Sequence, residues 1–118
     1  MQFQFNDSVG VLEQAKKEEL IKDLLTQVQK DFIRANASIQ LAFNLPISDL
    51  VTLLQEKIYV LVLEKYQEFL NLLYAVDIPE SQILKLASKD PVDLSSEVCF
   101  LILKREWQKV WFRHKFNS

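Results

Sequence analysis

Glycine is almost absent from this chain. Gly10 is the single glycine among 118 residues, and there are only three prolines. Glycine permits positive φ angles, tight hairpins and the close approach of a backbone to a phosphate. Its scarcity argues against glycine-rich phosphate loops, dinucleotide-binding fingerprints and β folds with many turns. Because 49% of the residues are hydrophobic, the composition predicts long, well-packed helices joined by short connections.

The residues that most often carry chemistry are equally scarce. Cys99 and His114 are the only cysteine and the only histidine, so neither an intrachain disulfide nor a zinc or di-iron ligand set can be assembled. Cys99 lies in the apolar run 98–103, which predicts a buried side chain. His114 stands among cations near the C-terminus, which is typical of a solvated helix end. We therefore expect no enzymatic activity, no metal and no cofactor.

Long hydrophobic runs are also missing. The longest uninterrupted apolar runs, 58–63 and 98–103, have six residues each, whereas a membrane-spanning helix needs about 20. The first seven residues lack the basic region and apolar core of a signal peptide. The length suits one domain, residues 1–118. We expect a cytoplasmic protein that does not bind membranes.

Helical periodicity dominates what is present. Apolar residues at spacings of three and four predict a first helix over 11–35. A second helix is expected over 49–76; it would be roughly 42 Å long, and its wide apolar arc places it at the centre of the bundle. A short third helix is expected over 79–87. The fourth is expected to begin near 93–96, after the break at Asp90-Pro91, and to run to about residue 115.

One segment has the period of a strand instead. The residues that alternate on one face of 39–45 are Ile39, Leu41, Phe43 and Leu45. Residues 1–5 alternate in the same way, so the two pieces could pair as a small ribbon, or 39–45 could be an extended linker packed on the helices. The predicted fold is all-α: a single-domain bundle of three long helices and one short helix, with a short extended segment at 39–45.

Charge is distributed unevenly along the chain. The net charge is −2, yet the residues from Lys104 onward carry +4 and the preceding 103 carry −6. Arg105, Lys109 and Arg113 form a basic stripe at i, i+4 and i+8 of the last helix. The stripe is interpreted either as a solvated helix back paired to acids on other helices, or as a phosphate-contacting surface. On the first interpretation, replacing all three cations by glutamine should leave the fold largely intact.

Aromatic residues accumulate on the same helix. Trp107 shares a face with apolar neighbours and is expected in the core, whereas Phe112 lies off that face and Phe116 lies at the same end of the chain. Candidate partner-contact residues are Arg105, Lys109, Arg113, Phe112 and Phe116. Together with the wide apolar arc of the second helix, these aromatic residues give more apolar surface than one small domain can bury. This surplus favours a non-catalytic interaction or scaffold module that forms a homodimer or binds another protein. The alternative is a small nucleic-acid-associated or regulatory protein that uses the basic C-terminal helix.

Three stretches of the sequence carry a family resemblance. Ile58-Tyr59, the segment 70–80 (LNLLYAVDIPE) and the segment 100–111 (FLILKREWQKVW) resemble a family of small all-helical bacterial proteins of the Bacteroidota type. The resemblance spans the chain from about residue 48 to its end. It implies a helical fold and no particular activity.

Overall fold

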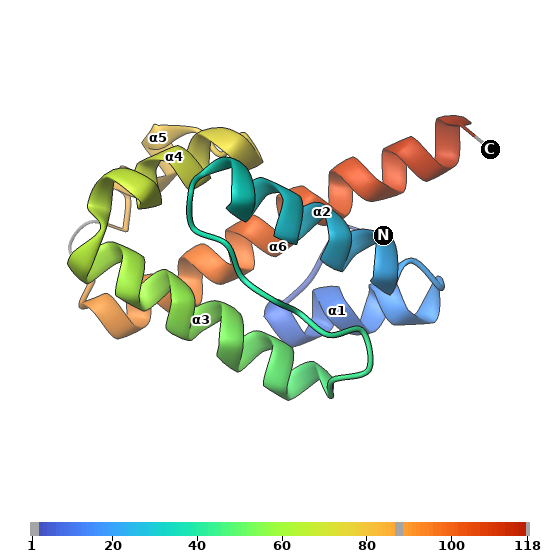
Figure 1. The fold of residues 1–118 in the computed structure, drawn as a ribbon. Coiled ribbons are helices and arrows are strands. Elements are labelled where there is room, and N and C mark those ends of the chain that lie inside the picture. The colour runs from blue at the N-terminus through green and yellow to red at the C-terminus, as the bar shows by residue number, and fades with distance from the viewer. Residues whose placement is uncertain (1–2, 87–88, 118) are drawn as a thin grey trace.

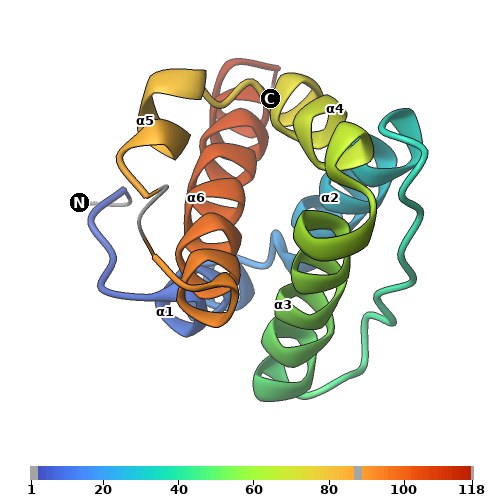
Figure 2. The same ribbon diagram turned by 90° about the vertical axis from the view of Figure 1, so that its left-hand side faces the viewer.

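Six helices make up the part of the chain that the computed structural model describes, residues 3–86 and 89–117 (Figures 1 and 2). In chain order they are α1 (Ser8–Lys17), α2 (Ile21–Arg34), α3 (Ile47–Glu64), α4 (Tyr66–Val76), α5 (Glu80–Leu84) and α6 (Pro91–Asn117). None of these residues lies in a strand. The predicted all-α class is confirmed, although two of the expected long helices are each divided in two.

The last helix, α6, is the centre of the fold. It packs against α1, α2, α3 and α4, and Figure 2 shows it running beside α1 with α2 and α3 opposite. Trp107 is 0% exposed and Cys99 is buried, which confirms the core positions predicted for both. The expectation that 49–76 forms the central helix is wrong, because the broad apolar surface of that segment belongs to two helices on one side of α6.

The first expected helix, 11–35, is interrupted between α1 and α2. Glu19 adopts a left-handed conformation with φ of 60°. The Leu20 N–H donates to the Ala15 carbonyl at 2.8 Å, and the Glu19 N–H donates to the Lys16 carbonyl at 3.1 Å. This pair of bonds is the Schellman closure that usually employs glycine. No glycine or proline therefore marks this helix break in the sequence.

The same closure recurs at two other helix ends. Asn36 after α2 and Asp77 after α4 have φ of 59° and 72°, and the following amides donate back to Phe32 and Leu73 at 2.9 Å. Gly10 lies inside α1 without a positive φ. These three helix ends thus use non-glycine residues in the left-handed conformation, so the scarcity of glycine does not require the helices to be long.

The second expected helix, 49–76, is also divided. Lys65, with φ of −139° and ψ of 61°, separates α3 from α4, and α4 turns to pack on α2. The bend allows Phe69 and Val76 to be fully buried, and this burial favours two helices over one.

The segment 39–45 is a linker and not a strand; it ends in a turn at Phe43-Asn44, where the Leu45 N–H donates to the Ala42 carbonyl at 3.2 Å. It connects α2 to α3, and the Leu41 N–H donates to the Gln29 side-chain oxygen at 3.1 Å. Leu41 is buried, but Phe43 is exposed, so the alternating residues do not share one buried face. Residues 3–5 have no strand assignment, and the first two residues of the predicted ribbon lie outside the described part of the chain.

The boundaries of the last two helices also differ from expectation. α5 ends at Leu84; the expected end near residue 87 lies outside the described residues. α6 begins at Pro91 because Asp90 caps it, accepting from the Asp93 N–H at 2.9 Å, and proline is well suited to the first helical position. Across the described residues, no helix combines the length and apolarity that a bilayer-spanning segment requires.

Candidate functional site

The outer side of α3 presents an apolar face to solvent. Leu53, Val60 and Leu63 are 37%, 41% and 52% exposed. At 100° per residue these three positions fall within about 80° of one another, so they form one stripe along the helix. We call these three residues the α3 face. Aligned aliphatic side chains left in water are typical of a surface that contacts another molecule.

The α3 face is exposed because the opposite side of the helix is already occupied. Leu50, Leu54, Ile58 and Leu61 recur at spacings of four, four and three and are buried, where α3 packs on α6. The apolar run 58–63 covers more than one full turn of a helix with 3.6 residues per turn. Only part of such a run can face the core, so the rest must face outward.

A groove lies beside the α3 face, where α3 passes the first turns of α6. Its volume is about 580 Å³, and its lining residues are Thr52, Gln55, Glu56, Tyr59, Val60, Val92 and Ser95. Tyr59 and Val92 add exposed apolar surface to this groove. Face and groove together form a continuous ridge and hollow with few charges, a shape that can accept a complementary helix.

Charged side chains border the α3 face. Lys57 and Glu64 lie on one side of Val60, about 60° and 40° around the helix, and Glu56 lies about 40° to the other side. Within residues 3–86 and 89–117, none of the three takes part in an ion pair. These charges are therefore available to a partner that docks on the face.

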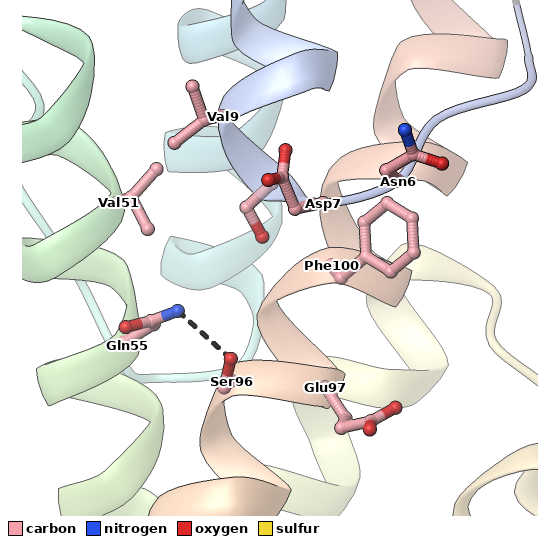
Figure 3. Close-up of a pocket in the computed structure, with 9 residues that line it drawn as sticks. Asn6, Asp7, Val9, Val51, Gln55, Ser96, Glu97 and Phe100 are labelled. Atoms are coloured by element: carbon pink, nitrogen blue, oxygen red, sulfur yellow. Dashed lines mark hydrogen bonds between the residues drawn. The ribbon is translucent and has the colours of Figure 1, made fainter.

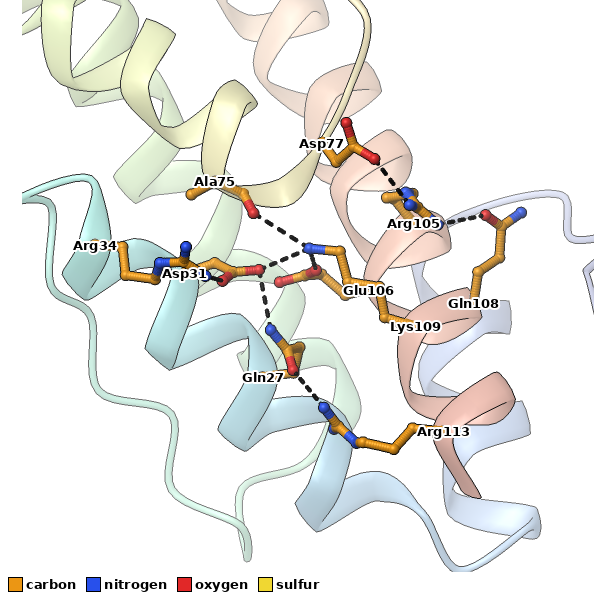
Figure 4. Close-up of polar contacts among 10 residues, drawn as sticks. All are labelled: Gln27, Asp31, Arg34, Ala75, Asp77, Arg105, Glu106, Gln108, Lys109 and Arg113. Carbon is orange, nitrogen blue, oxygen red and sulfur yellow. Dashed lines mark hydrogen bonds and ion pairs between the residues drawn. The ribbon is translucent and has the colours of Figure 1, made fainter. Parts of the chain in front are cut away.

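The predicted basic stripe is engaged inside the molecule (Figure 4). Arg105 pairs with Asp77 at 2.9 Å, and Arg113 donates to the Gln27 side-chain oxygen at 3.1 Å. Lys109 is only 22% exposed, so the interpretation of a uniformly solvated stripe is wrong at its middle position. The stripe pairs largely with groups on other helices.

Phe112 and Phe116, the aromatic candidates, lie on the end of α6 that extends beyond the other helices (Figure 1). Both are exposed, Phe116 at 74%. Their rings stack with centroids 5.9 Å apart, and Phe3 covers Phe112 and Trp111 from the N-terminal segment at 5.5 and 5.3 Å. These candidates form a separate aromatic tip, away from the α3 face.

A buried polar cluster joins α2, α4 and α6 (Figure 4). Asp31 and Glu106 are each 0% exposed. The Lys109 ammonium lies 3.0 Å from Asp31 and 2.9 Å from Glu106, and it also donates to the Ala75 carbonyl in the last turn of α4 at 3.2 Å. Gln27 donates to Asp31 at 3.2 Å. Lys109 thus connects three helices through a single ammonium group.

The two carboxyl groups of this cluster differ in protonation. Burial raises the pKa of Glu106 to about 9, and the hydrogen bond with Asp31 acts in the same direction. Burial alone would raise the pKa of Asp31, but hydrogen bonds from Glu106, Lys109 and Gln27 lower it below its usual value. The Lys109 ammonium, 2.9 Å from Oε1, acts in the opposite direction but does not outweigh burial, and Oε2 has no hydrogen-bond donor among the described residues. A protonated Glu106 instead donates to Asp31, so the cluster is neutral overall and structural in character.

A second pocket, of about 330 Å³, lies between the start of α1, α3 and α6 (Figure 3). Its polar lining includes Asp7, Glu97 and Ser96, whose hydroxyl accepts from the Gln55 amide at 3.3 Å. Burial raises the pKa of the nearby Cys99 thiol to about 11, which keeps it protonated and unreactive. Asp7 accepts from the Gly10 N–H at 2.8 Å and Glu97 pairs with Lys89 at 3.5 Å. Neither carboxylate is hydrogen-bonded to Ser96 as the base of an activated nucleophile would be.

No group of three or more metal-ligating side chains occurs in the described part of the chain. His114 is exposed near the end of α6, as expected for a solvated helix end. The arrangement offers surfaces and a structural cluster, without a catalytic constellation among the residues described.

Sequence reasoning missed the α3 face and the buried acids. The six-residue apolar run 58–63 was a signal, because a helix cannot bury its whole circumference against one neighbour. Glu106 was a second signal, since it falls with Leu103 and Val110 on the apolar stripe of the last helix. An acid at such a position is buried and needs a partner.

Comparison with known proteins gives no relative. No protein-family model, curated protein or solved structure matches this chain. Function must therefore be argued from the surfaces and the cluster themselves.

Proposed function

We propose that this chain is a non-catalytic helical interaction module that self-associates through the α3 face. The observation that carries the proposal is the exposed stripe of Leu53, Val60 and Leu63 beside an apolar groove. Burying such a stripe between two chains removes apolar surface from water, which stabilises an assembly by about 25 cal/mol for each Å² buried. The absence of a catalytic constellation among the described residues is consistent with a binding role.

A second copy is the occupant that the α3 face suits best. The same surface carries both a ridge, formed by the α3 face, and the hollow beside it, so one surface supplies both complementary shapes. Isologous contacts of this kind, in which one patch meets itself across a two-fold axis, are the commonest way in which soluble proteins form oligomers.

The nucleic-acid alternative has weaker support. It requires Arg105, Lys109 and Arg113 to contact phosphates, but all three already donate to acceptors within the chain. The exposed aromatic tip could stack on bases. Retention on heparin with a steep dependence on salt would favour this alternative.

The test is the mass of the protein in solution. Light scattering at micromolar concentration should give about twice the 13.8 kDa chain mass. Leu63→Glu places a charge on the α3 face and should give the monomer mass while far-UV circular dichroism remains unchanged. The matched control is Ile33→Glu, on an exposed aliphatic position of α2, which should leave the dimer intact. A wild-type protein that stays monomeric would refute the proposal.

A further inference from the structure

The charges around the α3 face are arranged asymmetrically. Lys57 and Glu64 lie on the same side of Val60 and are seven residues, or about two turns, apart. Neither has an ion-pair partner among residues 3–86 and 89–117. Two unpaired opposite charges on one edge of an apolar stripe restrict how a second copy can approach.

Parallel pairing of two α3 helices about a two-fold axis would place opposite edges of the two stripes together. Leu63 would then lie beside the charged edge of the partner subunit and would not reach the groove, which opens on the other edge. Antiparallel pairing about a two-fold axis between Val60 and Leu61 instead places Lys57 opposite Glu64 of the partner subunit. The symmetry forms this pair twice.

The same arrangement fills the groove. With the axis between positions 60 and 61, Leu63 of the partner subunit lies level with Ile58, on the side of α3 that carries Tyr59. That side is where the groove opens beside Gln55, Tyr59 and Val60. The 52% exposed Leu63 side chain therefore enters the groove of the other copy, and the symmetry again repeats the contact.

From these two observations we infer that two copies pair through antiparallel α3 helices, with Lys57 opposite Glu64 and Leu63 in the groove of the partner subunit. This inference rests on the self-association proposed above and adds its orientation and register. It makes Val60 the residue of the α3 face that lies nearest to its own symmetry mate. Leu53 and its mate are about 22 Å apart along the helix axis, because 15 positions separate them at 1.5 Å each.

Single cysteines test this register. A disulfide needs Cα atoms closer than about 7 Å, so mild oxidation should convert Val60→Cys to a covalent dimer and leave Leu53→Cys uncrosslinked. The wild type is the negative control and should not crosslink, because Cys99 is 1% exposed and burial raises its pKa to about 11. Light scattering of the reduced variants must show dimers in both cases.

Charge reversal provides an independent test. Lys57→Glu replaces both ion pairs by repulsions and should weaken the dimer about tenfold or more. Adding Glu64→Lys restores opposite charges in the antiparallel register and should recover the affinity. In a parallel dimer residues 57 and 64 of the two copies lie on opposite sides of the seam and do not pair, so the second change gives no rescue there and rescue identifies the orientation.

The outcomes separate the two proposals. A dimer in which Leu53→Cys crosslinks as readily as Val60→Cys, or in which the double reversal gives no rescue, overturns the antiparallel register and leaves self-association standing. Reduced variants and wild type that are all monomeric overturn both. Crosslinking of Val60→Cys alone together with rescue supports the register.

Discussion

The Asp31 carboxylate lies 3.0 Å from the Lys109 ammonium, joining positions of α2 and α6 that are far apart in sequence. Glu106 lies 2.9 Å from the same ammonium. With Glu106 protonated, one positive and one negative charge remain, so the buried cluster carries no net charge. This balance explains how two acids can be 0% exposed in a helical core.

Removing the ammonium should strongly destabilise the fold. Lys109→Met retains much of the side-chain volume but leaves the Asp31 charge without its principal cation, and breaking a buried pair in this way costs about 3–5 kcal/mol. Urea unfolding followed by circular dichroism measures the change in the free energy of unfolding. Lys30→Met, on an exposed position of α2, is the control and should lie within about 0.5 kcal/mol of wild type.

This prediction replaces the expectation that the basic stripe can be neutralised without consequence. Substituting Arg105, Lys109 and Arg113 together by glutamine removes the cation of the buried cluster, because Lys109 is only 22% exposed. The exposed Arg105–Asp77 pair should contribute little, about 0–1 kcal/mol. An Lys109→Met variant as stable as its Lys30→Met control would show that the cluster does not stabilise the fold.

Stability should fall as pH rises from about 5 to 9. Burial raises the pKa of Glu106 from its ordinary 4.5 to about 9, so between these values the folded protein binds one proton more than the unfolded chain. The free energy of unfolding then decreases with pH, by at most about 1.4 kcal/mol per unit. The lowered pKa of Asp31 acts only in acid, where its contribution is lost as pH falls through the folded pKa.

Glu106→Gln provides the matched variant. Glutamine is neutral at every pH and its amide can donate to Asp31 as the protonated carboxyl does. The free energy of unfolding of this variant should therefore be nearly independent of pH over the same range. Urea titrations at several pH values compare the two slopes, and parallel slopes for wild type and variant would contradict a protonated Glu106.

The left-handed residue between α1 and α2 offers a stabilising substitution. Glu19 has φ of 60°, a conformation that costs a non-glycine residue about 1–2 kcal/mol. Glu19→Gly should therefore raise the free energy of unfolding by about 1 kcal/mol. Lys17→Gly, two positions earlier at the last residue of α1, keeps a helical conformation and should lower it, by up to about 0.5–1 kcal/mol. If Glu19→Gly lowers the free energy of unfolding as much as Lys17→Gly does, the left-handed conformation of Glu19 does not strain the folded protein.

The sequence predicted the helical class well because that class follows from periodicity. Leu24, Val28 and Phe32 fall on one stripe and are fully buried, and the core position of Trp107 followed from its neighbours in the same way. The helix breaks at Glu19 and Lys65 could not be predicted. Neither carries a glycine or proline, and both depend on contacts between helices that local propensity does not encode.

The candidate surface could be predicted only in part. The exposure of Phe112 agrees with its position off the core stripe of the last helix. The exposure of the α3 face depends on which side of 58–63 packs against α6. The periodicity of one helix does not show which of its sides a neighbouring helix covers. The burial of Asp31 likewise depended on the approach of Lys109 from 78 positions away.

The chain has two tryptophans, and their different surroundings make each a separate optical reporter. Trp107 is fully buried and should emit at short wavelength until the core opens. Trp111 is partly exposed and touches the Phe3 ring at 5.3 Å, so its emission should respond to release of the N-terminal segment. Replacing one indole at a time by phenylalanine would therefore distinguish undocking of that segment from opening of the core.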